Sequence, residues 1–457
     1  MPASRKAPAI FPAGFEPVSI FFERRASGSL TRLDGRTRSP QILAECGCRI
    51  EGAVSGRPCA FVLDEPDPVG LPGIFDERFA RSLIDPAGLP PPVEAAAASL
   101  APIREAFGRW ESEILAGGDD GGEIAAVRME AALSVTMMSV ARLRGAALAH
   151  VVRDGRASLE GRLSITIRSE GRAVVVESTR WALVPSGSPD TNDLRAWDGA
   201  ARDALARGRL LIEAAPPPAM EGLAVFAPPA AGVLLHEICG HLLEGDLIVG
   251  RVSPFASLLG ERVAPEAVTI IDDPRAPGGR VALLADDEGE ETRSAVLIES
   301  GILRGFLTDA RSAAASGGHS TGHARRESYR HPALPRMTNL VMSAGDRDPA
   351  DLIREVTRGI FVERLGRGQV DPRRGEFRLE VESGRLIEGG EVGRPVAGGS
   401  LLGSCRDLLR SIDGIGTDAT MDHDAGACIK EDQIVPVGQV TPTLRVARVR
   451  IVPGAVA

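Results

Sequence analysis

The chain has 457 residues, enough for two to three domains, and its 43% hydrophobic and 25% charged residues are ordinary fractions for a globular protein. A net charge of −9 and the lack of a long basic run argue against a nucleic-acid-binding surface. No apolar run reaches the roughly 20 residues of a membrane-spanning helix. The first residues lack the apolar segment of a signal peptide, so we expect a cytoplasmic protein.

The first part of the chain predicts a mixture of strands and helices. Strand-forming runs bounded by turn residues lie at 17–24, 27–35, 47–64, 158–167 and 172–183. Helical composition indicates helices at 93–116 and 193–212. Residues 123–152 fit both structures. Met129, Leu133 and Met137 have helical spacing, whereas the stretch from Leu133 to Met137 alternates as a strand does.

A proline run at residues 216–218 follows the second helix and marks a domain boundary. We therefore predict an N-terminal domain over residues 1–214 and a C-terminal domain over residues 215–457. Besides a helix that follows residue 226, the second domain is expected to contain a short helix at 349–357 and strands at 223–226, 267–272, 281–284, 294–299, 302–307, 359–362, 376–383, 385–388 and 444–452. Residues 311–339 are expected to form a long polar loop, and such loops are often functional.

An apolar helix in the second part contains His236 and His241, with Glu237 directly after the first histidine. Imidazole nitrogens bind zinc, and a neighbouring carboxylate can take a proton from metal-bound water. The familiar zinc-protease motif places its histidines four residues apart. Here they are five apart, about 140° around a regular helix. An i to i+5 turn would bring them to one side, and Gly240 would ease that distortion.

A third ligand has to come from elsewhere in the chain. Cys428 follows a Gly/Ala turn and would complete a His2Cys set, which leaves one zinc position open for water, as in catalytic sites. Cys405 and Cys239 are alternatives, although Cys239 lies three residues after His236 and is expected to pack within the helix.

Two polar stretches could also serve the histidine helix. One is the acidic turn at residues 286–289, for which we favour a solvated loop as the interpretation. The other is the segment 322–332, which holds the only tyrosine of the chain, Tyr329. A tyrosine within a polar loop is a candidate donor to an oxyanion, although a plain surface loop would look the same.

These stretches together resemble the TldD/PmbA family of zinc metallopeptidases, once called modulators of DNA gyrase. The resemblance is to the TldD-like, metal-binding branch, since the PmbA-like (TldE) branch lacks the H-E-x-x-x-H. The matching segments follow one another through the second half, at 235–246, 286–289, 325–331, 335–339, 368–372 and 435–438. In the first half the resemblance is weak. It implies an α+β N-terminal domain and an antiparallel β-rich, barrel-like C-terminal domain that carries the zinc helix.

The resemblance also assigns roles to residues. His236, His241 and Cys428 match the zinc ligands of the family, and Glu237 matches its catalytic acid/base. The resemblance does not assign the residue that donates a hydrogen bond to the oxyanion. Tyr329 or His331 is our candidate for that role.

The chain departs from the family at two positions near the third ligand. Ile429 and Asp432 stand where the family usually has glycine, so the shape of the cleft is expected to differ.

The sequence therefore predicts a zinc-dependent peptidase that hydrolyses amide bonds in flexible peptides or unfolded proteins by metal-activated water. One alternative is a non-catalytic, zinc-containing scaffold that binds peptides. Another is a hydrolase that uses Cys428 as nucleophile, which would not need Glu237. The family implies a heterodimer with a PmbA/TldE-like paralogue, and a homodimer is the alternative.

Overall fold

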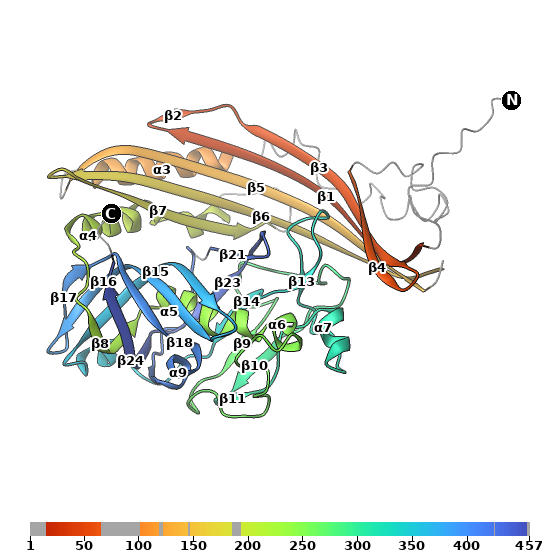
Figure 1. Ribbon diagram of the computed structural model, residues 1–457. Helices are drawn as coiled ribbons and strands as arrows, with labels where there is room; N and C mark the ends of the chain where they lie inside the picture. The colour runs from red at the N-terminus through yellow and green to blue at the C-terminus, as the bar shows by residue number, and fades with distance from the viewer. Residues whose placement is uncertain are drawn as a thin grey trace.

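The computed structural model describes residues 15–64, 101–117, 122–144, 147–184, 193–424 and 426–454. A large twisted sheet of long strands lies along one side of the molecule, and a β-barrel with smaller sheets lies against it (Figure 1). The described helices are all too short or too polar to span a bilayer. The structure is thus rich in strands, with helices added to each part, which is the α+β class that we predicted.

The first sheet is antiparallel, and its strand order is β4-β3-β1-β5-β6-β7, with the short β2 beside β1. The strands are β1 (Phe15–Leu33), β2 (Arg36–Thr37), β3 (Gln41–Val54), β4 (Arg57–Asp64), β5 (Glu123–Arg144), β6 (Ala147–Ser169) and β7 (Arg172–Leu183). The ambiguous residues 123–152 belong to β5 and β6. Met129, Ala131, Leu133 and Val135 are buried at every second position, so the strand period explains the apolar residues and the helical spacing was coincidental.

Two helices and a short 3-10 turn pack on this sheet: α3 (Ala101–Ala116), η2 (Asp193–Trp197) and α4 (Ala200–Glu213). Trp110 of α3 stacks on Trp197 with ring centroids 5.3 Å apart, and its Nε1 donates to the Trp197 carbonyl at 2.9 Å. The helix predicted over 193–212 is interrupted at Gly199, whose φ of 83° is left-handed. Residues 93–100 of the other predicted helix lie outside the described residues.

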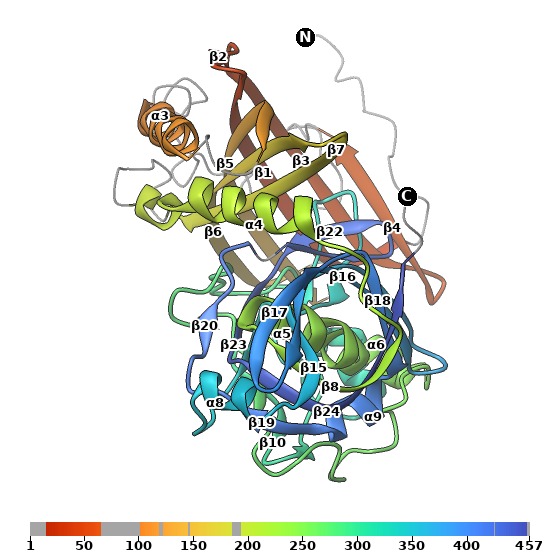
Figure 2. The same ribbon diagram turned by 90° about the vertical axis from the view of Figure 1, so that its left-hand side faces the viewer.

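The second part of the molecule is built around a closed, five-stranded barrel. Its strands are β8 (Met220–Phe226), β15 (Arg358–Asp371), β16 (Glu376–Glu388), β18 (Gly399–Ser404) and β24 (Leu444–Pro453). The order is β15-β8-β24-β18-β16, and pairing of β16 with β15 closes the ring. Only the β15–β8 pair is parallel. Figure 2 shows helix α5 (Pro228–Leu235) in the middle of the ring. This confirms the barrel-like, β-rich fold expected for this part.

Smaller elements surround the barrel. A six-stranded sheet has the order β11-β10-β9-β14-β23-β20. Its strands are β9 (Ile270–Asp272), β10 (Ala295–Glu299), β11 (Ile302–Leu303), β14 (Asn339–Met342), β20 (Thr420–Met421) and β23 (Gly438–Thr441). The other elements are β12 (Ala324–Arg325), β13 (Leu334–Pro335), β17 (Glu391–Val396), β19 (Ile412–Ile415), β21 (Ala427–Lys430), β22 (Gln433–Pro436), α6 (Gly245–Val249), α7 (Ala310–Ala315), α8 (Pro349–Arg354) and α9 (Cys405–Arg410).

Several predicted elements of the second half differ from the structure. Residues 281–284 form no strand, and the strands predicted at 376–383 and 385–388 are one continuous strand, β16. The predicted loop at 311–339 includes most of α7 and all of β12 and β13. The predicted domain boundary at residue 214 lies between α4 and β8, and it stays a prediction, because α4 contacts both β6 and β7 of the first sheet and β16 and β17 of the barrel region.

Candidate metal centre

The helix that carries the two histidines changes its hydrogen bonding at the first of them. α5 continues into a single π-helical turn, η3 (His236–Gly240), where the His241 N–H donates to the carbonyl of His236 five residues earlier. A 3-10 turn, η4 (His241–Leu243), follows. The imidazole rings meet edge to face with centroids 4.7 Å apart. The predicted i to i+5 turn is therefore confirmed, and it brings both histidines to one side.

Gly240 has a different role from the one that we expected. Its φ of −52° and ψ of −61° are right-handed helical values that other residues also adopt. A Cβ atom at this position would lie 2.1 Å from Sδ of Met337, closer than any real contact. The glycine is thus required because Met337 packs against the helix, and not because the π-turn needs unusual dihedral angles.

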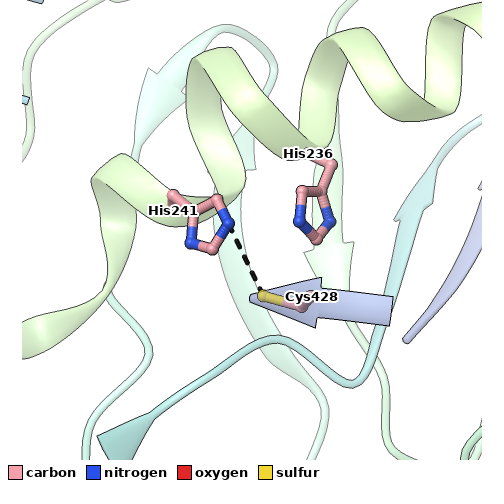
Figure 3. Close-up of side chains that lie close together, drawn as sticks. All are labelled: His236, His241 and Cys428. Atoms are coloured by element: carbon pink, nitrogen blue, oxygen red, sulfur yellow. Dashed lines mark hydrogen bonds between the residues drawn. The ribbon is translucent and has the colours of Figure 1, made fainter. Parts of the chain in front are cut away.

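Cys428, on strand β21, lies opposite the two histidines. Figure 3 shows both rings pointing from the helix toward this strand. One ligand atom from each of His236, His241 and Cys428 lies within 4.8 Å of the others, and His241 Nε2 is 3.5 Å from Cys428 Sγ. His236 Nδ1 is buried and has no hydrogen-bond partner among the described residues. Two imidazoles and a thiol at this spacing are a donor set that suits zinc.

The electrostatic environment separates Cys428 from the other candidate cysteines. Burial would raise its pKa, but His236 and His241 outweigh burial and lower the pKa of this thiol to about 5. Burial raises the pKa of Cys239 and of Cys405 to about 12, and neither belongs to the cluster. Because the thiolate is the form that binds metal, Cys428 has the chemistry of a ligand and the other two have that of packed thiols.

Side chains around the cluster orient its members. His241 Nδ1 lies 3.3 Å from Glu244 Oε2, so His241 Nε2 faces Cys428. Lys430 Nζ lies 2.8 Å from Glu244 Oε2 and 2.8 Å from Asp246 Oδ1. Burial would raise the pKa of Glu244, but Lys430 and His241 outweigh burial and lower it to about 2. Contacts of this kind fix the ring orientation of metal-binding histidines.

Sequence patterns did not predict the supporting residues of the cluster. The position of Glu244, three residues after His241, is a local signal that could have indicated its role. Lys430 and Arg336 carry no local signal, although Arg336 Nη2 donates to the Cys428 carbonyl at 2.6 Å. Their contacts connect segments that are far apart in the chain.

A cavity of about 1200 Å³ opens on the cluster, and we call it the metal cavity. His236, Glu237 and His241 line it, together with parts of β7, α4, β15 and β21. The Glu237 carboxylate has no hydrogen bond or ion pair with any described residue. A free carboxylate therefore faces the same space as the donor cluster.

Tyr329 and His331, the predicted oxyanion donors, do not line the metal cavity. Tyr329 is only 2% exposed, and its ring packs against residues of the first sheet. Its hydroxyl donates to the carboxylate of Asp64 at the end of β4. His331 Nδ1 lies 3.0 Å from Ser328 Oγ. The segment that contains both residues thus attaches the second part of the molecule to the first sheet.

The acidic turn is buried, whereas we had favoured a solvated loop. Asp286 accepts hydrogen bonds from the backbone N–H groups of residues 288, 290 and 324. Burial raises the pKa of Asp286 to about 6. Asp287 pairs with Arg156 of β6 at 2.7 Å. The turn is therefore a structural connection to the first sheet, and it does not line the metal cavity.

Comparison with known proteins identifies the family. A family model described as the PmbA/TldA metallopeptidase C-terminal domain matches residues 221–453, which include the barrel, the histidine helix and Cys428. The chain belongs to this family of metallopeptidases, as the sequence resemblance predicted.

Curated relatives agree with this assignment. The chain is 38% identical over 251 residues to the metalloprotease TldD homolog of Haemophilus influenzae, covering 55% of this chain and 52% of that protein. It is 30% identical over 241 residues to the zinc metalloprotease TldD homolog of Saccharolobus solfataricus, covering 52% and 53%. The matches thus span about half the length of these relatives.

Solved structures extend the similarity of fold to nearly the whole chain. TldE from Thermococcus kodakarensis superposes with a TM-score of 0.71 at 21% identity, covering 96% of this chain and 97% of that one. A protein described as a putative modulator of a DNA gyrase, from Thermotoga maritima, also gives 0.71, at 18% identity over 96% of both chains. At these identities the comparison concerns the fold alone.

Proposed function

We propose that this protein is a zinc-dependent peptidase of the H-E-x-x-x-H type that hydrolyses amide bonds in flexible peptides or unfolded proteins. One observation carries the proposal. Two imidazoles, His236 and His241, line a cavity together with the free carboxylate of Glu237, and their ligand atoms lie within 4.8 Å of a thiol of lowered pKa, Cys428. Relatives that are named metalloproteases, one of them a zinc metalloprotease, support it.

The donor set fits zinc better than it fits the harder cations. Thiolate and imidazole are preferred ligands of zinc, whereas calcium and magnesium take oxygen. In the proposal, His236, His241 and Cys428 hold the ion, which when bound polarises the scissile carbonyl and lowers the pKa of a water molecule. Three protein ligands leave one position open, and this is typical of catalytic rather than structural zinc sites.

Glu237 is the general acid/base of this proposal. Its carboxylate takes a proton from the attacking water as the new C–O bond forms, and it passes that proton to the leaving nitrogen as the C–N bond breaks. Among the described residues, none forms a hydrogen bond or an ion pair with this carboxylate, so it is available to accept a proton. Tyr329 and His331 have no part in the reaction here, because their side chains contact the first sheet and the adjoining segment instead of the metal cavity.

The size of the metal cavity supports an extended substrate. Its volume of about 1200 Å³ exceeds the roughly 300–1,000 Å³ of ordinary small-molecule pockets. We further propose that the protein works in the cytoplasm with a PmbA/TldE-like paralogue, with a homodimer as the alternative. The similarity of this fold to TldE supports two related subunits.

The decisive experiment replaces Glu237 by glutamine, which keeps size and hydrogen bonding but removes the base. We expect zinc to be retained and hydrolysis of an unfolded protein or flexible peptide to fall by roughly 10²- to 10⁴-fold. A matched control is Glu431→Gln, which changes an exposed carboxylate in the wall of the same cavity. A Glu237→Gln protein that holds zinc and still cleaves at the wild-type rate would rule out Glu237 as the base.

The same assay separates the other two functions. It is run with and without a PmbA-like partner, and with and without a chelator. A hydrolase that uses Cys428 as nucleophile keeps its activity when zinc is removed, whereas the proposed enzyme loses it. A wild-type complex that binds peptide without ever cleaving it would identify a scaffold.

A further inference from the structure

A second cavity, of about 700 Å³, lies between the first sheet and the segments of the second part around residues 280–284, 325–328 and 434–436. The hairpin of β21 and β22 separates it from the metal cavity, since Ile429 and Lys430 of β21 line the metal cavity while Ile434 and Val435 of β22 line the second one. Its volume is in the range of small-molecule sites. Neither zinc nor the proposed reaction makes use of it.

One part of the wall of this second cavity is apolar and exposed. Leu284 is 65% exposed and Ile434 is 50% exposed, and both line the cavity together with Phe21 and Trp181. Large apolar side chains that face a concave space favour a ligand whose apolar body removes them from water.

The other part of the wall contains an excess of positive charge. Seven arginines and five carboxylates line the cavity. Arg325 is only 4% exposed, and its Nη1 donates to the carbonyls of Met337 at 2.6 Å and of Pro436 at 2.7 Å. Among the described residues, its Nε and Nη2 have no hydrogen-bond partner, and no carboxylate forms an ion pair with it.

Two nearby acidic groups act on this guanidinium, Asp287 and Cys428, but neither forms a hydrogen bond with it. Asp287 is the acid that acts on it most strongly, but the oxygens of Asp287 bind Arg156 Nη1 and the Arg326 N–H, each at 2.7 Å. Trp181, in the same wall, has a buried Nε1 without a hydrogen-bond partner. A buried cation without an anion is costly, so the wall offers donors to a ligand that brings acceptors.

We propose that the second cavity binds an amphipathic carboxylate, whose charged end pairs with Arg325 and whose apolar body lies against Leu284, Ile434 and Trp181. Such a ligand is either a free aliphatic acid or the C-terminal end of a peptide with an apolar last residue. This site goes beyond the proposed peptidase function, because its occupation breaks no bond and needs no metal.

The first test uses isothermal titration calorimetry on the full-length protein with octanoate and with octanamide, its neutral counterpart. The titration is done on zinc-loaded and on chelator-treated protein, so that binding of octanoate to the metal is recognised and subtracted. We expect one octanoate per chain in both forms, with octanamide roughly tenfold weaker or more, because a hydrogen bond to a charged group is lost. Equal binding of octanamide, or absence of binding by both octanoate and the free-acid tripeptide used below, would overturn the proposal.

Variants then locate the site. Arg325→Met is expected to weaken octanoate binding roughly tenfold or more. Arg275→Met is the matched control, because Arg275 lines the same cavity with a half-exposed side chain whose loss should change binding by less than about twofold.

A second pair of variants avoids the buried arginine, whose replacement removes two buried hydrogen bonds and can impair folding. Leu284 is exposed, so both Leu284→Asp and Leu284→Lys should fold. The aspartate is expected to repel octanoate and the lysine is not. Equal affinities of the two variants would overturn the proposal even if Arg325→Met cannot be purified.

Two further arms identify the source of the carboxylate. An acetylated tripeptide ending in leucine is titrated with a free and with an amidated C-terminus. Preference for the free tripeptide over both its amide and octanoate assigns the cavity to peptide C-termini. Preference for octanoate over the free tripeptide assigns it to free acids. If the two tripeptides bind equally well while octanoate does not bind, the carboxylate has no role and the proposal fails.

Discussion

Lys430 and Glu244 form an ion pair of 2.8 Å in the wall of the metal cavity, although 186 residues separate them in the chain. Glu244 is fully buried, and its other neighbour is the Nδ1 atom of His241, at 3.3 Å. Lys430 belongs to the same strand as Cys428. This pair therefore joins the strand of one candidate ligand to the helix that carries the other two.

Replacing Lys430 by methionine should weaken zinc binding without removing a ligand. Metal affinity falls roughly 10- to 100-fold when the residues that orient the ligands are lost. The affinity is measured by competition with a chromophoric chelator. Lys430→Arg should recover part of the loss, and Glu431→Gln, on the exposed tip of the same hairpin, should have no effect. Wild-type zinc affinity in Lys430→Met would show that the ion pair does not position the ligands.

The purified protein should contain about one zinc per chain, as a single site with three protein ligands requires. Cys428→Ala should lose most of this zinc. Cys405→Ala is the matched control, because Cys405 is also a buried cysteine but its raised pKa of about 12 keeps it a thiol. Metal content is determined by mass spectrometry of acid-digested protein. Equal zinc retention in the two variants would exclude Cys428 as a ligand.

Asp424 connects three elements through one carboxylate. Its oxygens bind Arg180 of β7 at 2.5 Å, Arg207 of α4 at 3.0 Å and Arg364 of β15 at 2.5 Å. Breaking a buried ion pair from one side costs about 3–5 kcal/mol, so Asp424→Asn should lower the free energy of unfolding by that order. Denaturant unfolding measures it. Asp203→Asn removes an exposed partner of Arg180 and should cost less than about 1 kcal/mol. A similar decrease in the free energy of unfolding in both variants would mean that the buried ion pairs of Asp424 stabilise the fold no more than an exposed pair does.

The contribution of Asp424 should also depend on pH. Burial opposes its ionisation, but Arg364, Arg180 and Arg207 outweigh burial and lower the pKa of the carboxyl. A carboxyl whose pKa is lower in the folded than in the unfolded state stabilises the fold above the unfolded value, about 3.9 for aspartate. That stabilisation is lost as the pH falls further, through the folded pKa. The difference between wild type and Asp424→Asn should therefore be constant from pH 7 to about pH 5 and shrink below about pH 4. A difference that grows on acidification contradicts this.

Tyr329→Phe decides whether the tyrosine takes part in catalysis. Because the hydroxyl contacts Asp64 rather than the metal cavity, we expect zinc content to be unchanged and turnover to stay within about twofold. Loss of an oxyanion donor would instead lower kcat about 10²- to 10³-fold. Such a loss would restore the role that the sequence suggested.

Gly47→Val tests the structural role of the same tyrosine. A Cβ atom at Gly47 would lie 2.0 Å from the Tyr329 ring, so a side chain there has to displace the ring. Thermal unfolding should show a loss of stability of about 1–3 kcal/mol, which is usual for overpacking. Unchanged stability would mean that the ring does not rest on the first sheet as described.

The sequence by itself determined features that depend on neighbours in the chain. The five-residue spacing of His236 and His241 required an i to i+5 turn, because helical geometry alone decides where two rings on one helix point. The strands predicted at 158–167 and 172–183 followed from local turn and strand preferences, and they pair as β6 and β7. The resemblance of the sequence motifs to the TldD/PmbA family predicted both the family and the barrel-like fold of the second part.

Tertiary structure decided which distant groups meet. Period alone could not assign residues 123–152, and pairing of β5 with β1 and β6 did so by burying every second side chain. The sequence places Tyr329 in a polar loop, whereas in the structure its ring is buried against the first sheet.

The ion pair of Lys430 with Glu244 and the unpaired guanidinium of Arg325 have no counterpart in any local pattern. They arise because barrel closure and the β21–β22 hairpin bring together segments about a hundred or more residues apart. This approach in space decides which charge is neutralised and which is left for a ligand. Coulomb attraction depends on the distance between two charges in space and not on their separation along the chain.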